Sequence, residues 1–237
     1  MNDAASMDPL EKAWAEAAAM DDTLQTQLDF FVAASRRIEP EVHLAYDRMI
    51  ERVTRAGGGV SAPAVGDMLP DALLCDQGGR LVSLSSLCAQ SALVVSFNRG
   101  HWCPFCRLQL NALKRAGSEF AALGARIVSI VPETAEYSCR MIEMNDLPFP
   151  VLSDVDHAFA MELGLATWMG EEIETLYAAG GLDLARFQGG RSGLLPIPAT
   201  FVLAQGGRVL ARFVEPDFQK RMALDAIGAA LIGHTRS

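Results

Sequence analysis

The chain has 237 residues and is half apolar, which is enough to fill the core of one large domain or of one domain with a helical extension. Its net charge of −9, without a basic stripe, argues against a nucleic-acid partner because phosphates would be repelled. No apolar run approaches the roughly 20 residues of a membrane span, and the start MNDAASMDPLEKAW lacks the apolar stretch of a signal peptide, so we expect a cytoplasmic protein.

The first 60 residues predict a helical extension ahead of the main domain. Leu24 and Leu28 recur at helical spacing, and Pro40 is expected to open a second helix because proline suits the first helical position. Two amphipathic helices cannot bury their apolar stripes alone, so we expect this segment to pack on the main domain or on another chain. Its lone histidine, His43, is interpreted as a surface residue.

Residues 61–237 alternate between short apolar runs and longer amphipathic stretches. The order implies a parallel sheet with helices on both faces, then an antiparallel hairpin around the glycines of QGG and a closing helix capped by Asp217. This is the order of a thioredoxin-like α/β domain with a central mixed sheet. The predicted strands are 92–97, 125–131, 149–154, 199–204 and 208–214, and the predicted helices are 103–124, 134–146, 157–163 and 217–232.

The motif RGHWCPFC, which begins at Arg99, lies where the first of these strands turns into a helix. Ligands and chemistry collect at this end of an open α/β sheet. Unpaired N–H groups at the helix start lower the pKa of a thiol at Cys103, and Arg99 and Arg107 are candidates to add to this effect. Pro104 is tolerated at the first helical position, and Cys103 and Cys106 share one helical face, within reach of a disulfide.

Two cysteines three residues apart are typical of a redox couple or of half a metal site. Structural zinc needs four ligands, and His101 and the other cysteines are scattered without ligand spacing. A redox couple is therefore favoured, and we expect no metal and no organic cofactor. Cys75, Cys88 and Cys139 are interpreted as small buried residues.

A second feature is LPIPATFVL, in which Pro198 directly precedes an apolar run. Proline is normally unwelcome in a buried strand, and a cis peptide bond would suit a tight turn there. The plainer interpretation is a rigid loop before the strand. We predict that Ile197–Pro198 is cis and packs beside the cysteine pair.

These motifs carry a resemblance to a known family. Trp-Cys-Pro-Phe-Cys on a strand-to-helix turn, followed by Ile-Pro-Ala-Thr-Phe-Val-Leu, is similar to the thioredoxin fold with its active-site pair and facing cis proline. More closely, residues 65–235 resemble the peroxiredoxin-like branch of the AhpC/TSA (alkyl hydroperoxide reductase and thiol-specific antioxidant) family. The segments that carry this resemblance are VGDMLPDALLCDQGGRLVSLSSL, FNRGHWCPFCRLQL, VLSD and ATFVLAQGGRVLARFV.

The chain departs from the family at the active-site motif. Peroxiredoxins carry Pro-x-x-x-Thr-x-x-Cys, whereas here Arg99 stands at the proline position and Cys103 at the threonine position. The threonine helps to hold peroxide in the family, so its replacement brings the site closer to a thiol–disulfide oxidoreductase. The peroxiredoxin register selects Cys106 as the attacking thiol and the thioredoxin register selects Cys103. An exposed position at the edge of the turn favours Cys103, because deeper burial raises the pKa of Cys106.

The resemblance implies a thiol-dependent peroxidase for hydrogen peroxide or organic hydroperoxides. A thiolate would become a sulfenic acid and then a disulfide, which an external thioredoxin- or glutathione-like thiol would reduce. Arg99, Trp102, Pro104 and Pro198 are the expected binding or stabilising residues. The alternatives are a thioredoxin-like reductase of disulfide substrates and a non-enzymatic redox-sensing or partner-binding protein. The segment 166–196 is interpreted as a lid, the contact of a homodimer, or a long loop with a helix.

Overall fold

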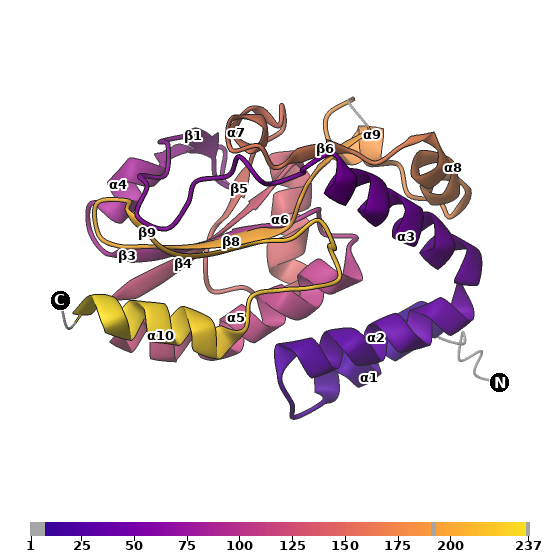
Figure 1. Ribbon diagram of the computed structural model, residues 1–237, viewed down its shortest axis with the longest axis horizontal. Helices are drawn as coiled ribbons and strands as arrows, with labels where there is room; N and C mark the ends of the chain where they lie inside the picture. Colours follow the sequence, from indigo (N-terminus) through magenta and orange to yellow (C-terminus); the bar gives the residue numbers. More distant parts are fainter. Residues whose placement is uncertain (1–7, 191–192, 236–237) are drawn as a thin grey trace.

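A seven-stranded mixed sheet forms the core of the computed structural model, which describes residues 8–190 and 193–235 (Figure 1). The strand order is β2-β1-β5-β4-β3-β8-β9, with β3, β4 and β5 parallel and the other neighbours antiparallel. Strands β6 and β7 form a separate antiparallel pair. The strands are β1 (Leu73–Cys75), β2 (Leu81–Ser83), β3 (Ala92–Phe97), β4 (Ala125–Val131), β5 (Val151–Ser153), β6 (Ala166–Trp168), β7 (Leu194–Pro196), β8 (Ala199–Leu203) and β9 (Val209–Val214).

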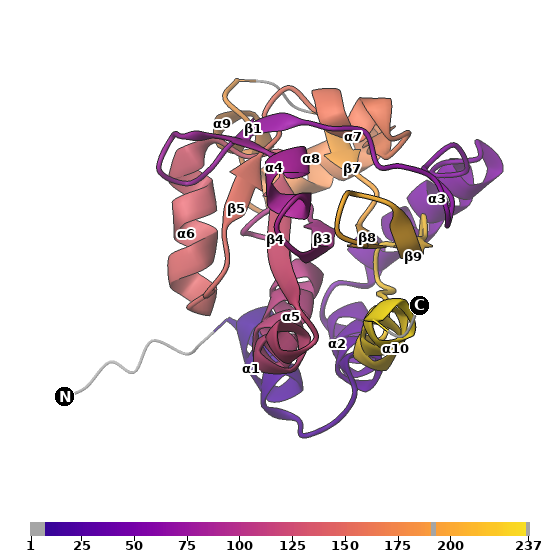
Figure 2. The same cartoon turned by 90° about the vertical axis from the view of Figure 1, so that its left-hand side faces the viewer.

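Helices cover both faces of the large sheet, which confirms the predicted thioredoxin-like fold. Helices α5, α6 and α10 lie on one face, and α4 and α7 lie on the other (Figure 2). The helices are α1 (Pro9–Ala19), α2 (Leu24–Ile38), α3 (Pro40–Arg55), α4 (Leu84–Cys88), α5 (Pro104–Ala122), α6 (Ala135–Asn145), α7 (Ala158–Glu162), α8 (Glu171–Ala179), α9 (Leu184–Phe187) and α10 (Leu224–Thr235). None of these described helices is long and apolar enough to cross a bilayer.

The central strands follow from their apolar, β-branched sequences. β3 reads ALVVSF, and all six of its residues are buried. Because successive side chains alternate, Leu93 and Val95 belong to one core and Val94 to the other. The predicted bounds of β3 and β4 are confirmed at both ends.

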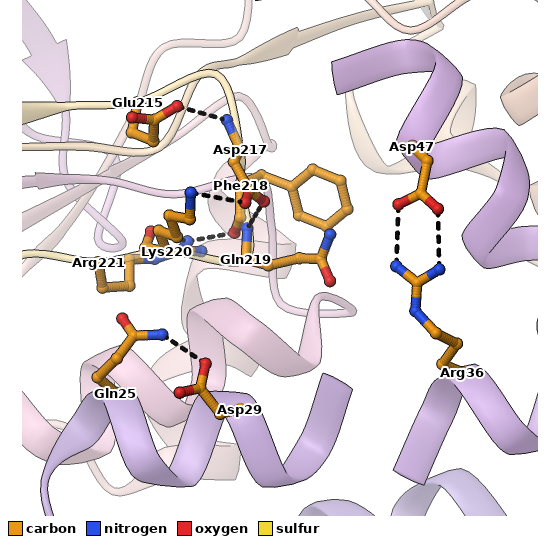
Figure 3. A network of polar contacts seen from close by, with 10 residues as sticks. All are labelled: Gln25, Asp29, Arg36, Asp47, Glu215, Asp217, Phe218, Gln219, Lys220 and Arg221. Atoms are coloured by element: carbon orange, nitrogen blue, oxygen red, sulfur yellow. Dashed lines mark hydrogen bonds and ion pairs between the residues drawn. The ribbon is translucent and has the colours of Figure 1, made fainter. Parts of the chain in front are cut away.

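Three helices, rather than two, form the N-terminal segment. The chain breaks at Met20–Thr23 because the Thr23 side chain caps α2, accepting a hydrogen bond from a backbone N–H of its first turn. Pro40 begins α3, as predicted. Helices α1 and α2 pack on α5, and α3 packs on α8. A two-fold hydrogen-bonded ion pair between Arg36 and Asp47 joins α2 to α3 (Figure 3).

His43 is buried, so its interpretation as a surface residue is wrong. The side chain faces inward where α2 and α3 meet, and only 2% of it is exposed. Its Nε2 lies 2.9 Å from Ser35 Oγ, and its ring packs edge-on against Tyr46. The N-terminal segment therefore has a polar, aromatic interior of its own.

The closing helix α10 begins at Leu224 rather than at residue 217, and Asp217 does not cap it. The Asp217 carboxylate instead accepts a hydrogen bond from the Gln219 backbone N–H within a loop (Figure 3). The loop stays irregular because Phe218 and Arg221 both turn their side chains into the interior. Those two side chains reach the cysteine motif.

The segment 166–196 is more regular than a long loop with one helix. Its described part contains β6, α8, α9 and β7. Helix α8 packs on α3 and brings Tyr177 into the interior. The segment thus supplies a residue to the site described next.

Candidate active site

The cysteine motif occupies the turn between β3 and α5. Cys103 is the N-cap residue of α5, Pro104 is its first residue, and Cys106 lies in its first turn. The start of the turn is fixed by Asn98, whose side-chain amide donates to Ser96 and Ser129. The pair therefore lies at the carboxyl end of the parallel strands, as predicted.

Cys103 and Cys106 are both reduced and fully buried. The Cys106 sulfur accepts a hydrogen bond from the Arg99 backbone N–H at 3.3 Å and one from Nη2 of Arg221 at 3.6 Å. The Cys106 sulfur is thus held by one donor from the backbone of the turn and one from a buried arginine.

The prediction that Cys103 is exposed is wrong, because the N-terminal segment covers the turn. Trp14 of α1 donates its indole N–H to the Pro104 carbonyl oxygen at 3.2 Å. On the other side, Trp102 packs edge-on against Tyr177, with ring centroids 5.2 Å apart. Trp102 and Pro104 thus lie beside the pair as predicted, but as parts of a closed wall.

The charges around the two thiols separate their pKa values. Burial works against a charged Cys103, but the Cys106 thiol and the charges of Arg99 and Arg221 outweigh burial and lower the pKa of Cys103 to about 6. For Cys106, burial and the adjacent Cys103 act in the same direction and raise its pKa well above that of an ordinary cysteine. Cys103 is therefore the cysteine of the pair that forms the thiolate.

Arg99 is a buried cation held by aromatic rings. Its guanidinium lies 4.0 Å from the ring centroid of Phe218 and 5.1 Å from that of Trp102. Its Nη2 donates to the Tyr177 hydroxyl at 2.6 Å. Burial opposes its charge, but attraction to Tyr177 and Cys103 raises the pKa of Arg99 above that of an ordinary arginine.

Arg221 supplies a second buried cation, which no motif in the sequence marks. Its Nε donates to the Gln109 side-chain oxygen at 2.6 Å, and its Nη2 points to the Cys106 sulfur. Arg107, the residue considered for this role, turns away from the thiols. It forms an ion pair with Glu11 at 2.7 Å and stacks on Trp14.

Two tyrosines continue the polar network away from Arg99. The Tyr177 hydroxyl, from α8, donates to the Tyr46 hydroxyl, from α3, at 3.1 Å. Burial raises the pKa of both groups, so both remain neutral near pH 7. Nothing near these tyrosines in the sequence marks them, because they reach the motif only through the packing of α3 and α8.

The Ile197–Pro198 peptide bond is trans, so the predicted cis bond is wrong; all peptide bonds in the described residues are trans. The chain runs from β7 into β8, and the Ile197 N–H donates to the Leu165 carbonyl oxygen at 2.7 Å. This extended path contains no tight turn that a cis bond would serve. Pro198 nevertheless lines a small cavity together with Arg99 and Phe218, which places it near the site.

The buried carboxylate of Glu133 anchors the turn through contacts with His101. Glu133 accepts hydrogen bonds from the His101 backbone N–H at 2.8 Å and approaches His101 Nδ1 at 2.8 Å. The His101 ring stacks on Tyr137. Gly100 between these groups has φ +146°, and a Cβ there would lie 2.5 Å from Trp102 Nε1 and 2.6 Å from Glu133 Oε1.

Replacing Gly100 with alanine is expected to lower the free energy of unfolding by about 2 kcal/mol or more, because the new methyl group adds a clash to a strained backbone. Urea denaturation measures the loss. Gly66→Ala is the matched control, since Gly66 also has a positive φ but nothing lies within 4 Å of its Cβ position. Equal losses in the two variants would show that the contacts around Gly100 do not matter.

The remaining cysteines stay apart from this site. Cys88 is buried, as predicted, whereas Cys75 and Cys139 are half-buried. Within residues 8–190 and 193–235, no three His, Cys, Asp or Glu side chains gather where they would hold a metal ion.

Comparison with known proteins identifies the family. A protein-family model described as the AhpC/TSA family matches residues 65–212. The chain belongs to the AhpC/TSA family. Helices α1–α3 lie outside the region that the AhpC/TSA model matches.

Individual AhpC/TSA relatives align over a shorter part of the chain. Peroxiredoxin Bcp of Escherichia coli is 28% identical over 115 residues, which are 47% of this chain and 73% of that protein. The bcp protein of Haemophilus influenzae is 30% identical over 102 residues, which are 43% of this chain and 65% of that protein. The chain thus spans slightly less than two thirds of the second relative.

Solved structures share the fold. Peroxidoxin BcpB from Mycobacterium tuberculosis aligns with a TM-score of 0.55 and 23% identity, covering 71% of this chain and 96% of that one. Reduced Prx3 from Vibrio vulnificus aligns with a TM-score of 0.57 and 20% identity, covering 72% of this chain and 99% of that one.

Proposed function

We propose that this AhpC/TSA protein is a thiol-dependent peroxidase in which Cys103 attacks the peroxide and Cys106 resolves the product. The observation that carries the proposal is the burial of two guanidinium groups, Arg99 and Arg221, beside the thiols. Among the described residues neither is paired with a carboxylate, and burying an unpaired charge is costly. A thiolate at Cys103 supplies the missing negative charge.

The reaction follows from this charge arrangement. The Cys103 thiolate attacks one peroxide oxygen, the O–O bond breaks, and the leaving oxygen takes up a proton to become water or an alcohol. Arg99 faces the oxygen on which negative charge develops. The Cys106 thiol then attacks the sulfenic sulfur, forming the disulfide and releasing water. An external thiol restores both thiols.

The burial of both sulfurs supports a small oxidant. A hydroperoxide needs only a narrow path to Cys103, whereas the disulfide of a protein substrate must come into direct contact with the attacking sulfur. Any protein partner, whether a disulfide substrate or a thioredoxin-like reductant, reaches these sulfurs only when part of the wall opens, whereas a small peroxide does not need that opening. We place the reductant among thioredoxin- or glutathione-like thiols and the protein in the cytoplasm, where such thiols are maintained.

The reduced protein is expected to consume one equivalent of hydrogen peroxide per chain in stopped-flow measurements and to form a Cys103–Cys106 disulfide. Mass spectrometry of digested protein should find this crosslink, reversible by dithiothreitol. Insulin reduction without peroxide consumption would instead indicate a disulfide reductase, and the absence of both activities would leave a sensing or binding role.

A further inference from the structure

A cavity of about 260 Å³ lies between α1–α3, α8 and the turn that carries Cys103. More than half of its lining residues come from residues 8–46, which precede the region matched by the family model. Six of its lining residues are aromatic: Trp14, Phe31, Tyr46, Trp102, Phe105 and Tyr177. A cavity of about 150 Å³ is enough to hold benzene in a protein interior, so this one has room for a compact organic group.

The cavity and Cys103 share their walls. Trp102 and Pro104, the chain neighbours of Cys103, both line the cavity. Tyr46 and Tyr177 line it too, and the charge of Cys103 contributes to the raised pKa of each after the larger effect of burial. The cavity therefore lies against the residues on either side of Cys103 in the chain.

The polar groups of the lining set its charge preference. Three carboxylates, those of Asp8, Glu11 and Glu39, face the cavity, and among the described lining residues there is no lysine or arginine. Arg107 pairs with Glu11 from outside the lining and offsets that charge. Asp8 and Glu39 remain, so a ligand carboxylate would meet like charges.

His43 adds an uncharged polar group. Burial, followed by the repulsion of Arg36, lowers the pKa of His43, so the ring is neutral near pH 7. Its Nε2 is hydrogen-bonded to the Ser35 hydroxyl, and its buried Nδ1 has no hydrogen-bond partner among the described residues. His43 therefore adds no charge to the lining, which suits an uncharged ligand.

We propose that this cavity is a specificity site that holds the organic part of a hydroperoxide and favours uncharged, compact apolar groups over groups with a carboxylate. The inference rests on the proposed peroxidase function. The chemistry is the same step as above: the S–O bond to Cys103 forms, the O–O bond breaks, and the organic alcohol leaves with one proton. The N-terminal helices, rather than the motif, then determine which substrate is used.

The first test narrows the cavity. Val42→Phe places a larger side chain on α3 at a lining position and is expected to lower kcat/KM for cumene hydroperoxide about tenfold, with the value for hydrogen peroxide changed less than twofold. Leu44→Phe is the matched control, because Leu44 lies on the same helix with an exposed side chain outside this cavity. An unchanged cumene hydroperoxide value in Val42→Phe would overturn the proposal.

The second test removes a charge without changing shape. The wild-type protein is expected to prefer cumene hydroperoxide over its ring-carboxylated analogue, and Glu39→Gln should reduce that preference several-fold. The Glu39 side chain is only half-buried, so the variant is expected to fold. The same preference between the two hydroperoxides in wild type and Glu39→Gln would contradict the proposed selection against a carboxylate. If the wild-type protein does not reduce even hydrogen peroxide, the proposed peroxidase function itself is wrong.

Discussion

Replacing Cys103 with serine is expected to abolish peroxide reduction, lowering the rate by a factor on the order of 1,000 or more. The physical reason is that the Cys103 sulfur carries the negative charge of the pair: its pKa is lowered to about 6, whereas that of Cys106 is raised. A serine hydroxyl at the same place stays protonated and is a poor nucleophile. Stopped-flow consumption of hydrogen peroxide measures the effect.

Cys106→Ser separates attack from resolution. This variant should react once with peroxide and accumulate a sulfenic acid at Cys103, which a dimedone-type trap and mass spectrometry would locate. Cys139→Ser is the control, because Cys139 lies away from the site and its thiol donates to the Gln77 carbonyl oxygen, a bond that serine retains. A trapped sulfenic acid at Cys106 in Cys103→Ser would assign the attack to Cys106 and restore the peroxiredoxin register.

Replacing Arg99 with methionine is expected to raise the pKa of Cys103 by about two units or more, toward the ordinary cysteine value of about 8.5. The sign follows from the charge: Arg99 favours the thiolate, so without it the thiolate forms only at higher pH. Methionine is flexible and apolar, and it can fill the space among Trp102, Tyr177 and Phe218. Thiolate absorbance near 240 nm against pH gives the midpoint.

Arg107→Met provides the comparison, because Arg107 is a second buried arginine close to the turn, in helix α5. Arg107 is also buried, but its guanidinium pairs with Glu11 and stacks on Trp14 instead of facing the thiols. Its removal should leave the titration midpoint of Cys103 unchanged. A similar shift in both variants would mean that overall packing, and not the Arg99 charge, sets the pKa.

The local parts of the fold were predictable from the sequence. β3 (ALVVSF) and β4 (ARIVSIV) are predominantly apolar runs rich in β-branched residues, and their limits were predicted to the residue. β1 and β2 were not predicted, since each has three residues and its first leucine, Leu73 or Leu81, is exposed. Strands this short carry too little periodicity to stand out.

The candidate site was predictable only in its contiguous part. Arg99, Trp102, Cys103 and Cys106 share one motif, and the structure brings them together. Arg221 lies 115 residues from Cys106 in the sequence and reaches it through a loop that the periodicity presented as helix. Tyr177 meets Arg99 across 78 residues. Contacts of this kind arise from packing between elements, which a local pattern does not record.

The two buried guanidinium groups also affect the electron affinity of the site. In the reduced protein, Arg99 and Arg221 face a thiolate, whereas in the disulfide they face two neutral sulfurs. The positive charges therefore stabilise the reduced state and raise the reduction potential, by about 30 mV for each 1.4 kcal/mol of stabilisation. The disulfide proposed for Cys103 and Cys106 would therefore be reduced by weaker thiols than the same disulfide would need without the two cations.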